Sequence, residues 1–178
     1  ALATVLLPFL PMLPAQILLN NFLSDFPAIA IAGDSVDPER LGTAQRWDIS
    51  RIRRFMVVFG LVSSVFDMVT FAWLHFVVGA DVQTFRTAWF VESLLTQLAV
   101  LFVLRTRRHF WKSRPSTFLL WSSVIVGIVA VLLPFTGSVA DMFEFKPLGI
   151  GLVIALLAIV VAYVATTEAT KRYQRLGD

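Results

Sequence analysis

Five apolar segments, each close to the length of a membrane-spanning helix, constrain this chain more than any other feature. They cover roughly residues 12–33, 55–78, 87–104, 116–135 and 148–167. A helix needs about 20 predominantly apolar residues to cross the hydrocarbon core of a bilayer. The composition agrees, with 57% hydrophobic residues and a mean hydropathy of +0.77. The sequence therefore predicts an all-α integral membrane bundle that forms a single transmembrane domain over residues 1–178, with the lipid bilayer as its surroundings.

The first residues predict a helix end and a turn. Residues 1–7 are apolar but too short to span, and Pro8, Pro11 and Pro14 then interrupt any helix. We interpret 1–7 as the truncated end of a preceding helix and 8–14 as a tight turn at the membrane surface. No basic region precedes the apolar run, so a signal peptide is not expected. We expect the chain to be a fragment of something longer.

Basic residues are distributed unequally between the two sides of the predicted bundle. Connector 34–54, connector 105–115 and the tail from 168 together hold 13 of the 15 lysines and arginines, whereas the other connectors hold only Arg86 and Lys146. Basic loops stay cytoplasmic, so we expect both basic connectors and the C-terminus to lie in the cytoplasm. The small, sided net charge of +3 indicates membrane orientation and not nucleic-acid binding.

Three acidic residues lie inside the predicted spans, and no lysine or arginine accompanies them. They are Asp25, Asp67 and Glu92. An ionised side chain at mid-bilayer costs about 3 kcal/mol on insertion scales. These acids must therefore be protonated or face a cation, which indicates a transport site for an ion or a proton.

The stretch from Asn20 to Pro27 carries the densest polar cluster in a span. Asn21 and Asp25 are four residues apart and share a helical face, and Asn20 and Ser24 pair in the same way alongside. Carboxylate, amide and hydroxyl oxygens suit magnesium or calcium. Interhelical hydrogen bonding by asparagine and serine is the alternative. Pro27 removes one helical hydrogen bond, so we expect an unwound or kinked backbone beside Asp25.

The other two acids allow two interpretations each. Asp67 is either a cation ligand or a protonated acid hydrogen-bonded to a neighbouring helix. Glu92 has a role in the site or its access path, or it is an acid near the interface that reaches water. Near Asp67, Gly60 and Ser64 form a small-residue pair that permits close helix packing.

These residues resemble the membrane region of P-type cation-transporting ATPases. The family's sixth span carries an asparagine, a hydroxyl residue and an aspartate, then a proline and an alanine, and the matching stretch here is LPMLPAQILLNNFLSDFPAIAIAGDSVDPE. Three later pieces are similar to the magnesium-transporting branch, namely RWDISRIRRFMVVFGLVSSVFDMVTFA, AWFVESLLTQ and VLRTRR. The resemblance covers essentially the whole chain, from the end of the fifth span to the tenth.

The resemblance implies that Asn21, Ser24 and Asp25 help to form a transmembrane site for a divalent cation. Because the later pieces resemble the magnesium-transporting branch, the implied cation is magnesium. Glu92 resembles an acid that the eighth span contributes in some pumps. The Asp-x-Pro-Ala continuation is more similar to calcium pumps, so calcium stays open. The implied partners are the remaining spans and the cytoplasmic domains of such a pump, and the implied location is a bacterial plasma membrane.

The chain lacks the DKTGT phosphorylation motif and a nucleotide-binding region, so alone it is not expected to hydrolyse ATP. Two other functions stay open. One is a stand-alone membrane protein that does not transport, either an accessory subunit or a remnant of a pump. The other is a proton-coupled secondary transporter that uses the three acids as relays, although no internal repeat supports it.

Overall fold

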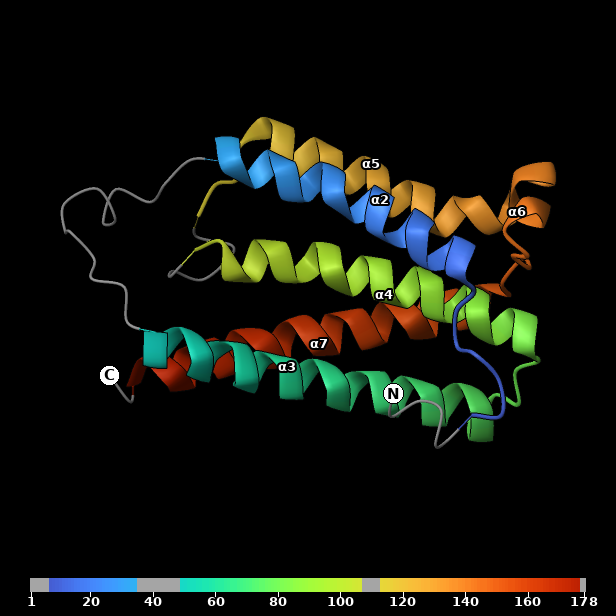
Figure 1. The fold of residues 1–178 in the computed structure, drawn as a ribbon, viewed down its shortest axis with the longest axis horizontal. Coiled ribbons are helices and arrows are strands. Elements are labelled where there is room, and N and C mark those ends of the chain that lie inside the picture. The colour runs from blue at the N-terminus through green and yellow to red at the C-terminus, as the bar shows by residue number, and fades with distance from the viewer. Residues whose placement is uncertain (1–6, 35–48, 107–112, 177–178) are drawn as a thin grey trace.

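The structure, a computed structural model, describes residues 7–34, 49–106 and 113–176 (Figure 1). Helices account for most of this part of the chain. Their bounds are α2 Pro14–Ala30, η1 Ile31–Gly33, α3 Ile49–Ala72, η3 Trp73–Val77, α4 Val82–Leu104, α5 Thr117–Leu132, η5 Leu133–Phe135, α6 Ser138–Met142 and α7 Ile150–Leu176. The predicted helical membrane bundle is confirmed.

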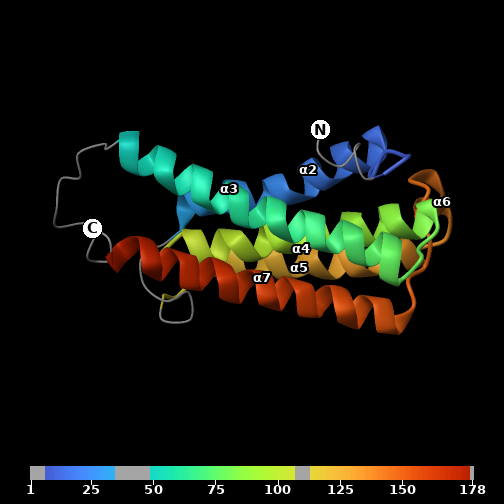
Figure 2. The same ribbon diagram turned by 90° about the horizontal axis from the view of Figure 1, so that it is seen from below.

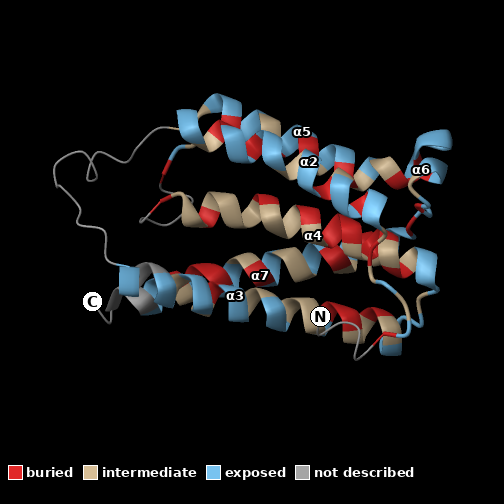
Figure 3. Ribbon diagram, viewed as in Figure 1, coloured by how far each residue is buried: buried red, intermediate tan, exposed pale blue. Residues whose placement is uncertain are grey.

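Helix α4 lies at the centre of the bundle. In Figure 1 it runs between an upper pair, α2 and α5, and a lower pair, α3 and α7, and it packs against α7, α2 and α5. Of its membrane-length window 44% is buried, compared with 17% for α3 and for α7. Buried positions accordingly gather along α4 in Figure 3, while the outer helices present apolar surface of the kind that lipid covers.

Four helices are long and apolar enough to cross a membrane, namely Arg53–Val77, Val82–Leu104, Thr117–Phe135 and Ile150–Tyr173. Helix α2 has 17 residues, and the 3-10 turn η1 extends it by three. At about 1.5 Å per α-helical residue and about 2 Å per 3-10 residue, the two together approach the thickness of the hydrocarbon core. The interpreted helix end at residues 1–7 lies, except for Leu7, outside the described residues.

Three helices extend beyond their predicted limits, and the first of them, α3, begins at Ile49 instead of residue 55. Helix α4 begins at Val82 instead of residue 87, because its polar first turn continues the helix outside the apolar window. Helix α7 continues to Leu176, well past residue 167, where the sequence suggested a tail. Helices α4 and α7 lie side by side, seen from two directions in Figures 1 and 2.

The expectation of an unwound backbone at Pro27 was wrong. Helix α2 is continuous through Pro27 to Ala30 and only then tightens into η1. A proline inside a helix removes one donor, and a membrane helix tolerates that loss where neighbouring protein surrounds it. The Pro27 side is indeed buried within the bundle.

Close helix packing occurs at a different glycine from the one suggested by the sequence. A Cβ on Gly60 would meet no atom within 4 Å, and Ser64 is exposed. A Cβ on Gly127 of α5 would instead lie 3.6 and 3.7 Å from Leu95 and Leu98 of α4. The small residue that brings two described helices together is therefore on α5.

The basic end of the bundle, where α2, α4 and α7 end and α3 and α5 begin, is joined by buried charges. The Arg105 guanidinium bonds the Asp34 carboxylate at 2.6 Å and donates to the Ser113 carbonyl. The second oxygen of Asp34 accepts the backbone N–H of Ser116. The ends of α2 and α4 and the start of α5 therefore meet at one ion pair.

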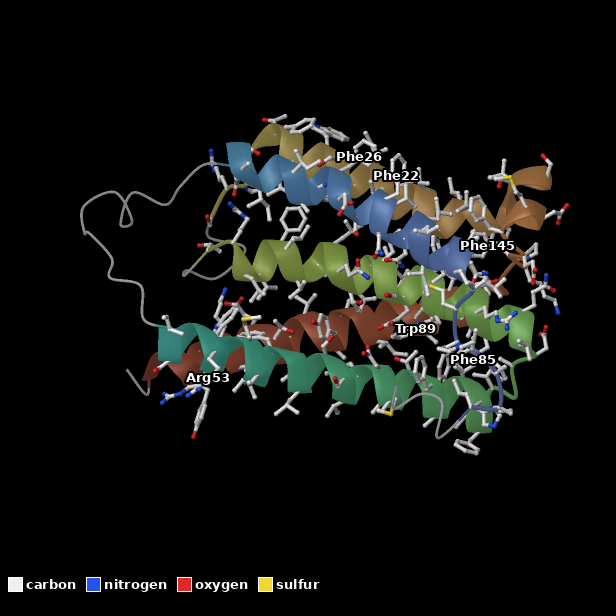
Figure 4. All side chains as sticks on the ribbon, viewed as in Figure 1. Phe22, Phe26, Arg53, Phe85, Trp89 and Phe145 are labelled. Carbon is white, nitrogen blue, oxygen red and sulfur yellow. The ribbon has the colours of Figure 1, made fainter. Side chains whose placement is uncertain are left out.

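The opposite end is held by hydrogen bonds between side chains and backbone. Gln16 on α2 donates to the Phe143 carbonyl at 2.8 Å, and its other end accepts the Leu13 N–H. Arg86 on α4 donates to the Leu10 carbonyl at 3.0 Å. Phe85 and Phe145, labelled in Figure 4, fill the apolar space at this end. These contacts fix the position of α2 along the axis of α4.

Candidate functional site

Helix α2 presents the sequence-predicted polar residues on two different faces. Its buried positions are Gln16, Asn20, Pro27 and Ala30, which face the other helices. Asn21 and Asp25 are exposed. Because successive helical residues are about 100° apart, an inward Asn20 directs Asn21 and Asp25 to a neighbouring side of α2.

Asn20 is 3% exposed and is held by α4. Its side-chain oxygen accepts a hydrogen bond from the Gln97 amide at 2.9 Å. Its side-chain amide approaches the Phe90 carbonyl at 3.5 Å, the long limit of a hydrogen bond. In this structure the side chain of Asn20 therefore makes interhelical hydrogen bonds between α2 and α4.

Asn21 and Asp25, with the half-buried Ser24 beside them, form the outward polar part of α2. The Ser24 hydroxyl donates to the Asn21 carbonyl of its own helix at 3.0 Å, so its oxygen keeps lone pairs available. On an adjoining strip, Phe22 and Phe26 stack edge to face at 5.0 Å between ring centres and point away from the bundle in Figure 4. A carboxyl group therefore lies beside an apolar surface, within the segment that the sequence predicts to span the membrane.

Glu92 is the most deeply placed acid. It is 1% exposed, and within the described residues one of its carboxylate oxygens has no hydrogen-bond partner. Asp67, on α3, is partly buried and lies close enough for its charge to repel that of Glu92. The alternative in which Glu92 reaches water at the interface does not fit this burial.

The structure does not combine the three acids into one centre. Among residues 7–34, 49–106 and 113–176, no group of three or more histidine, cysteine or acidic side chains could hold a metal ion. It instead places Asp67 within electrostatic range of Glu92 and leaves Asp25 exposed on α2. Oxygen atoms from outside the described residues, or water, would have to complete a cation site at Asp25.

An open groove of about 290 Å³ lies beside Asn20 and Asn21. Trp89, Ser93 and Gln97, spaced four residues apart on α4, form one wall, and residues 10–12 close the end away from the basic end. Trp89, which is labelled in Figure 4, also packs edge to face against Phe71 of α3, with 4.5 Å between ring centres. The polar lining of the groove is neutral, consisting of amides and a hydroxyl.

Sequence reasoning did not select Gln97 as a site residue. Its signal was present, since Ser93 and Gln97 are one turn apart in an apolar helix. Which helix they would meet was not readable from α4 alone. The Asp34–Arg105 pair was missed for a related reason, because both residues lie at span ends where charges are common.

The family model described as "Cation transporting ATPase, C-terminus" matches residues 9–173, nearly all of the chain. The chain belongs to this family. A Salmonella typhimurium protein named "Magnesium-transporting ATPase, P-type 1" is 39% identical over 176 residues, 96% of this chain and 19% of the relative. The protein of the same name from Escherichia coli K12 is also 39% identical over 96% of this chain and 20% of its own length.

A second Salmonella typhimurium protein with that printed name is 31% identical over 99% of this chain and 20% of the relative. The chain therefore spans about a fifth of the length of the curated relatives that it matches. The resemblance to the membrane region of P-type cation-transporting ATPases, and to their magnesium-transporting branch, is confirmed.

Proposed function

We propose that this domain is the C-terminal membrane part of a larger magnesium-transporting P-type pump. In this proposal α2 supplies oxygen ligands to the transported cation. The remaining spans and the cytoplasmic phosphorylation and nucleotide-binding domains belong to the rest of the pump. Transport would follow alternating access, driven by phosphorylation of an aspartate elsewhere in that protein.

The observation that carries the proposal is the exposed carboxylate of Asp25 on an apolar helix. Asn21 lies one turn away on the same exposed side, and both residues are beside the apolar Phe22 and Phe26. An ionisable side chain at membrane depth faces protein or a polar cavity, since lipid cannot solvate it. A cation shared with further spans satisfies this requirement with the oxygen chemistry that magnesium prefers.

The candidate residues take different parts in this proposal. Asp25 and the Asn21 amide oxygen are direct or water-mediated ligands, with Ser24 as a weaker third. Magnesium keeps several of its waters, so few protein ligands suffice. Glu92 supplies negative charge inside the bundle, and Asp67 adds a second acidic group within electrostatic range of Glu92. The basic end is cytoplasmic in this proposal, because it carries the basic connectors.

Magnesium uptake by the full-length pump with Asp25→Asn tests the proposal. The substitution keeps the shape and removes the charge. Uptake and cation-dependent control of phosphorylation should be lost. Asp141→Asn is the matched control, because Asp141 is exposed in the short helix α6 outside the spans. Wild-type uptake with Asp25→Asn would contradict the proposal.

Two further measurements separate the alternatives. Competition between magnesium and calcium in the uptake assay identifies the preferred ion. The reading frame upstream of Ala1 distinguishes a pump from a stand-alone protein. A continuous frame with DKTGT supports the pump, and a start codon with a ribosome-binding site directly before Ala1 contradicts it. Uptake that survives loss of ATP but collapses with the proton gradient would favour a secondary transporter.

A further inference from the structure

The inward side of α2 combines two partly buried leucines, Leu19 and Leu23, with four fully buried positions that carry no large apolar side chain. Its buried residues are two amides, a proline and an alanine, namely Gln16, Asn20, Pro27 and Ala30. In a membrane, apolar packing alone does not distinguish a bundle interior from lipid, whereas interhelical hydrogen bonds do. The rotation of α2 about its axis therefore depends strongly on its polar contacts.

The side-chain nitrogen of Gln97 makes two hydrogen bonds, one of them to α2. It donates to Asn20 Oδ1 at 2.9 Å and to Ser93 Oγ at 3.1 Å. A primary amide has two N–H donors, so both are engaged, one across to α2 and one within α4. Ser93 thereby fixes the direction in which Gln97 presents its second hydrogen to Asn20.

Asn20 transmits this constraint to the exposed face of α2. Asn21 follows Asn20 directly, and Asp25 lies a turn beyond Asn21 on the same side. A rotation of α2 that broke the Asn20–Gln97 bond would turn both residues by the same angle. A small rotation moves a side-chain oxygen by about 1 Å, which is enough to take it out of contact with a bound cation.

We infer that Gln97 is a positioning residue, which fixes the rotation of α2 through Asn20 so that Asn21 and Asp25 present their oxygens to the transported cation. This inference rests on the proposed function. Asn20 then acts as a structural link and not as a cation ligand. Gln97 itself does not touch the ion.

The test measures the magnesium concentration that half-activates the full-length pump, together with the maximal rate. Gln97→Leu should raise the half-activating concentration by roughly three- to twenty-fold, the range of measured interhelical hydrogen bonds in membranes. The maximal level of phosphorylation should stay near that of the wild type. Asn20→Leu should do the same, and the double variant should be no worse than either single variant.

A length exchange provides the rescue. Asn20→Gln combined with Gln97→Asn keeps the summed length of the two side chains, so it should recover most of the affinity that Gln97→Asn alone loses. Thr96→Val is the matched control. The Thr96 hydroxyl donates to carbonyls of its own helix, those of Glu92 and Ser93, so its loss should leave the half-activating concentration unchanged.

Three outcomes would overturn the inference: an unchanged half-activating concentration in Gln97→Leu, an equal shift in Thr96→Val, or independent effects in the double variant. Asp25→Asn, measured in parallel, distinguishes this failure from that of the proposed function. Loss of transport in Asp25→Asn with normal Gln97→Leu removes only the positioning role. Normal transport in Asp25→Asn removes the proposed site itself.

Discussion

Arg105 and Asp34 form a 2.6 Å ion pair whose side chains are only 3% and 9% exposed. Arg105 follows the end of α4, and Asp34 follows η1 at the end of α2. Removing one partner of a buried pair leaves the other charge desolvated, which costs about 3–5 kcal/mol. We expect Arg105→Met to lower the free energy of unfolding by that amount, measured by unfolding of the detergent-purified protein.

The exposed pair at the opposite end is the matched control. Lys146 lies 3.1 Å from Asp81, and the two side chains are 49% and 54% exposed. Exposed ion pairs contribute about 1 kcal/mol or less. Lys146→Met should therefore change stability by no more than that. Equal losses of stability in Arg105→Met and Lys146→Met would contradict the stabilising role of the buried Arg105–Asp34 pair.

The helices were predictable from the sequence because hydrophobicity over about 20 residues depends on local composition alone. Their ends were less predictable. Helix α4 starts at Val82 with a polar turn, and α7 continues to Leu176 through charged residues, since a helix continues wherever polar side chains find partners. The predicted unwinding at Pro27 was wrong because the sequence did not indicate that Pro27 would be buried among neighbouring helices.

The polar residues of the candidate site were predictable, but their partners were not. Unpaired acids in apolar segments mark Asp25, Asp67 and Glu92 without any structure. Their directions depend on the rotation of each helix, which long-range contacts such as Asn20–Gln97 determine. The same limit explains why Gly60 was selected for close packing while Gly127 makes the close approach. A glycine pattern does not say which helical face meets a neighbour.

Lys171 fastens the end of α4 to α7. Its ammonium group bonds Glu168 at 2.7 Å and donates to the Val103 carbonyl at 2.9 Å, and both charged side chains are buried. Lys171→Met should destabilise the protein by about 3–5 kcal/mol, because the buried Glu168 loses the adjacent ammonium charge and α4 loses a donor at its C-terminal carbonyls. Thermal unfolding in detergent measures this.

The double variant Glu168→Leu with Lys171→Met should recover part of the loss, since an apolar replacement of a buried pair is often neutral. A double variant that is less stable than Lys171→Met alone would contradict this account. The exposed Arg172, next in the chain, provides the control. Arg172→Met should change stability by less than about 1 kcal/mol.

Asp81 should titrate below its usual range. The Thr84 hydroxyl donates to its carboxylate, and Lys146 adds a second hydrogen bond and a positive charge, so the pKa of Asp81 is lowered. A carboxyl with a depressed folded-state pKa stabilises the fold above its unfolded pKa of about 3.9, and that stabilisation is lost as the pH falls through the folded pKa. Carbon NMR of the carboxyl should give a midpoint below that value. Thr84→Val should raise the midpoint, and an unchanged midpoint would contradict the role of Thr84.

Glu92 should lower the stability of the protein and support transport. Its carboxyl group is 1% exposed, one of its oxygens has no partner within the described residues, and Asp67 adds repulsion. Glu92→Gln keeps the shape and removes the ionisable group that Asp67 repels, so the detergent-purified protein without magnesium should become more stable at a pH where this carboxyl group is ionised. Magnesium uptake should fall, because the bundle loses negative charge that favours a cation. Glu144→Gln, at an exposed position, is the control and should change neither quantity. Reduced stability together with normal uptake in Glu92→Gln would show that the carboxylate serves packing alone.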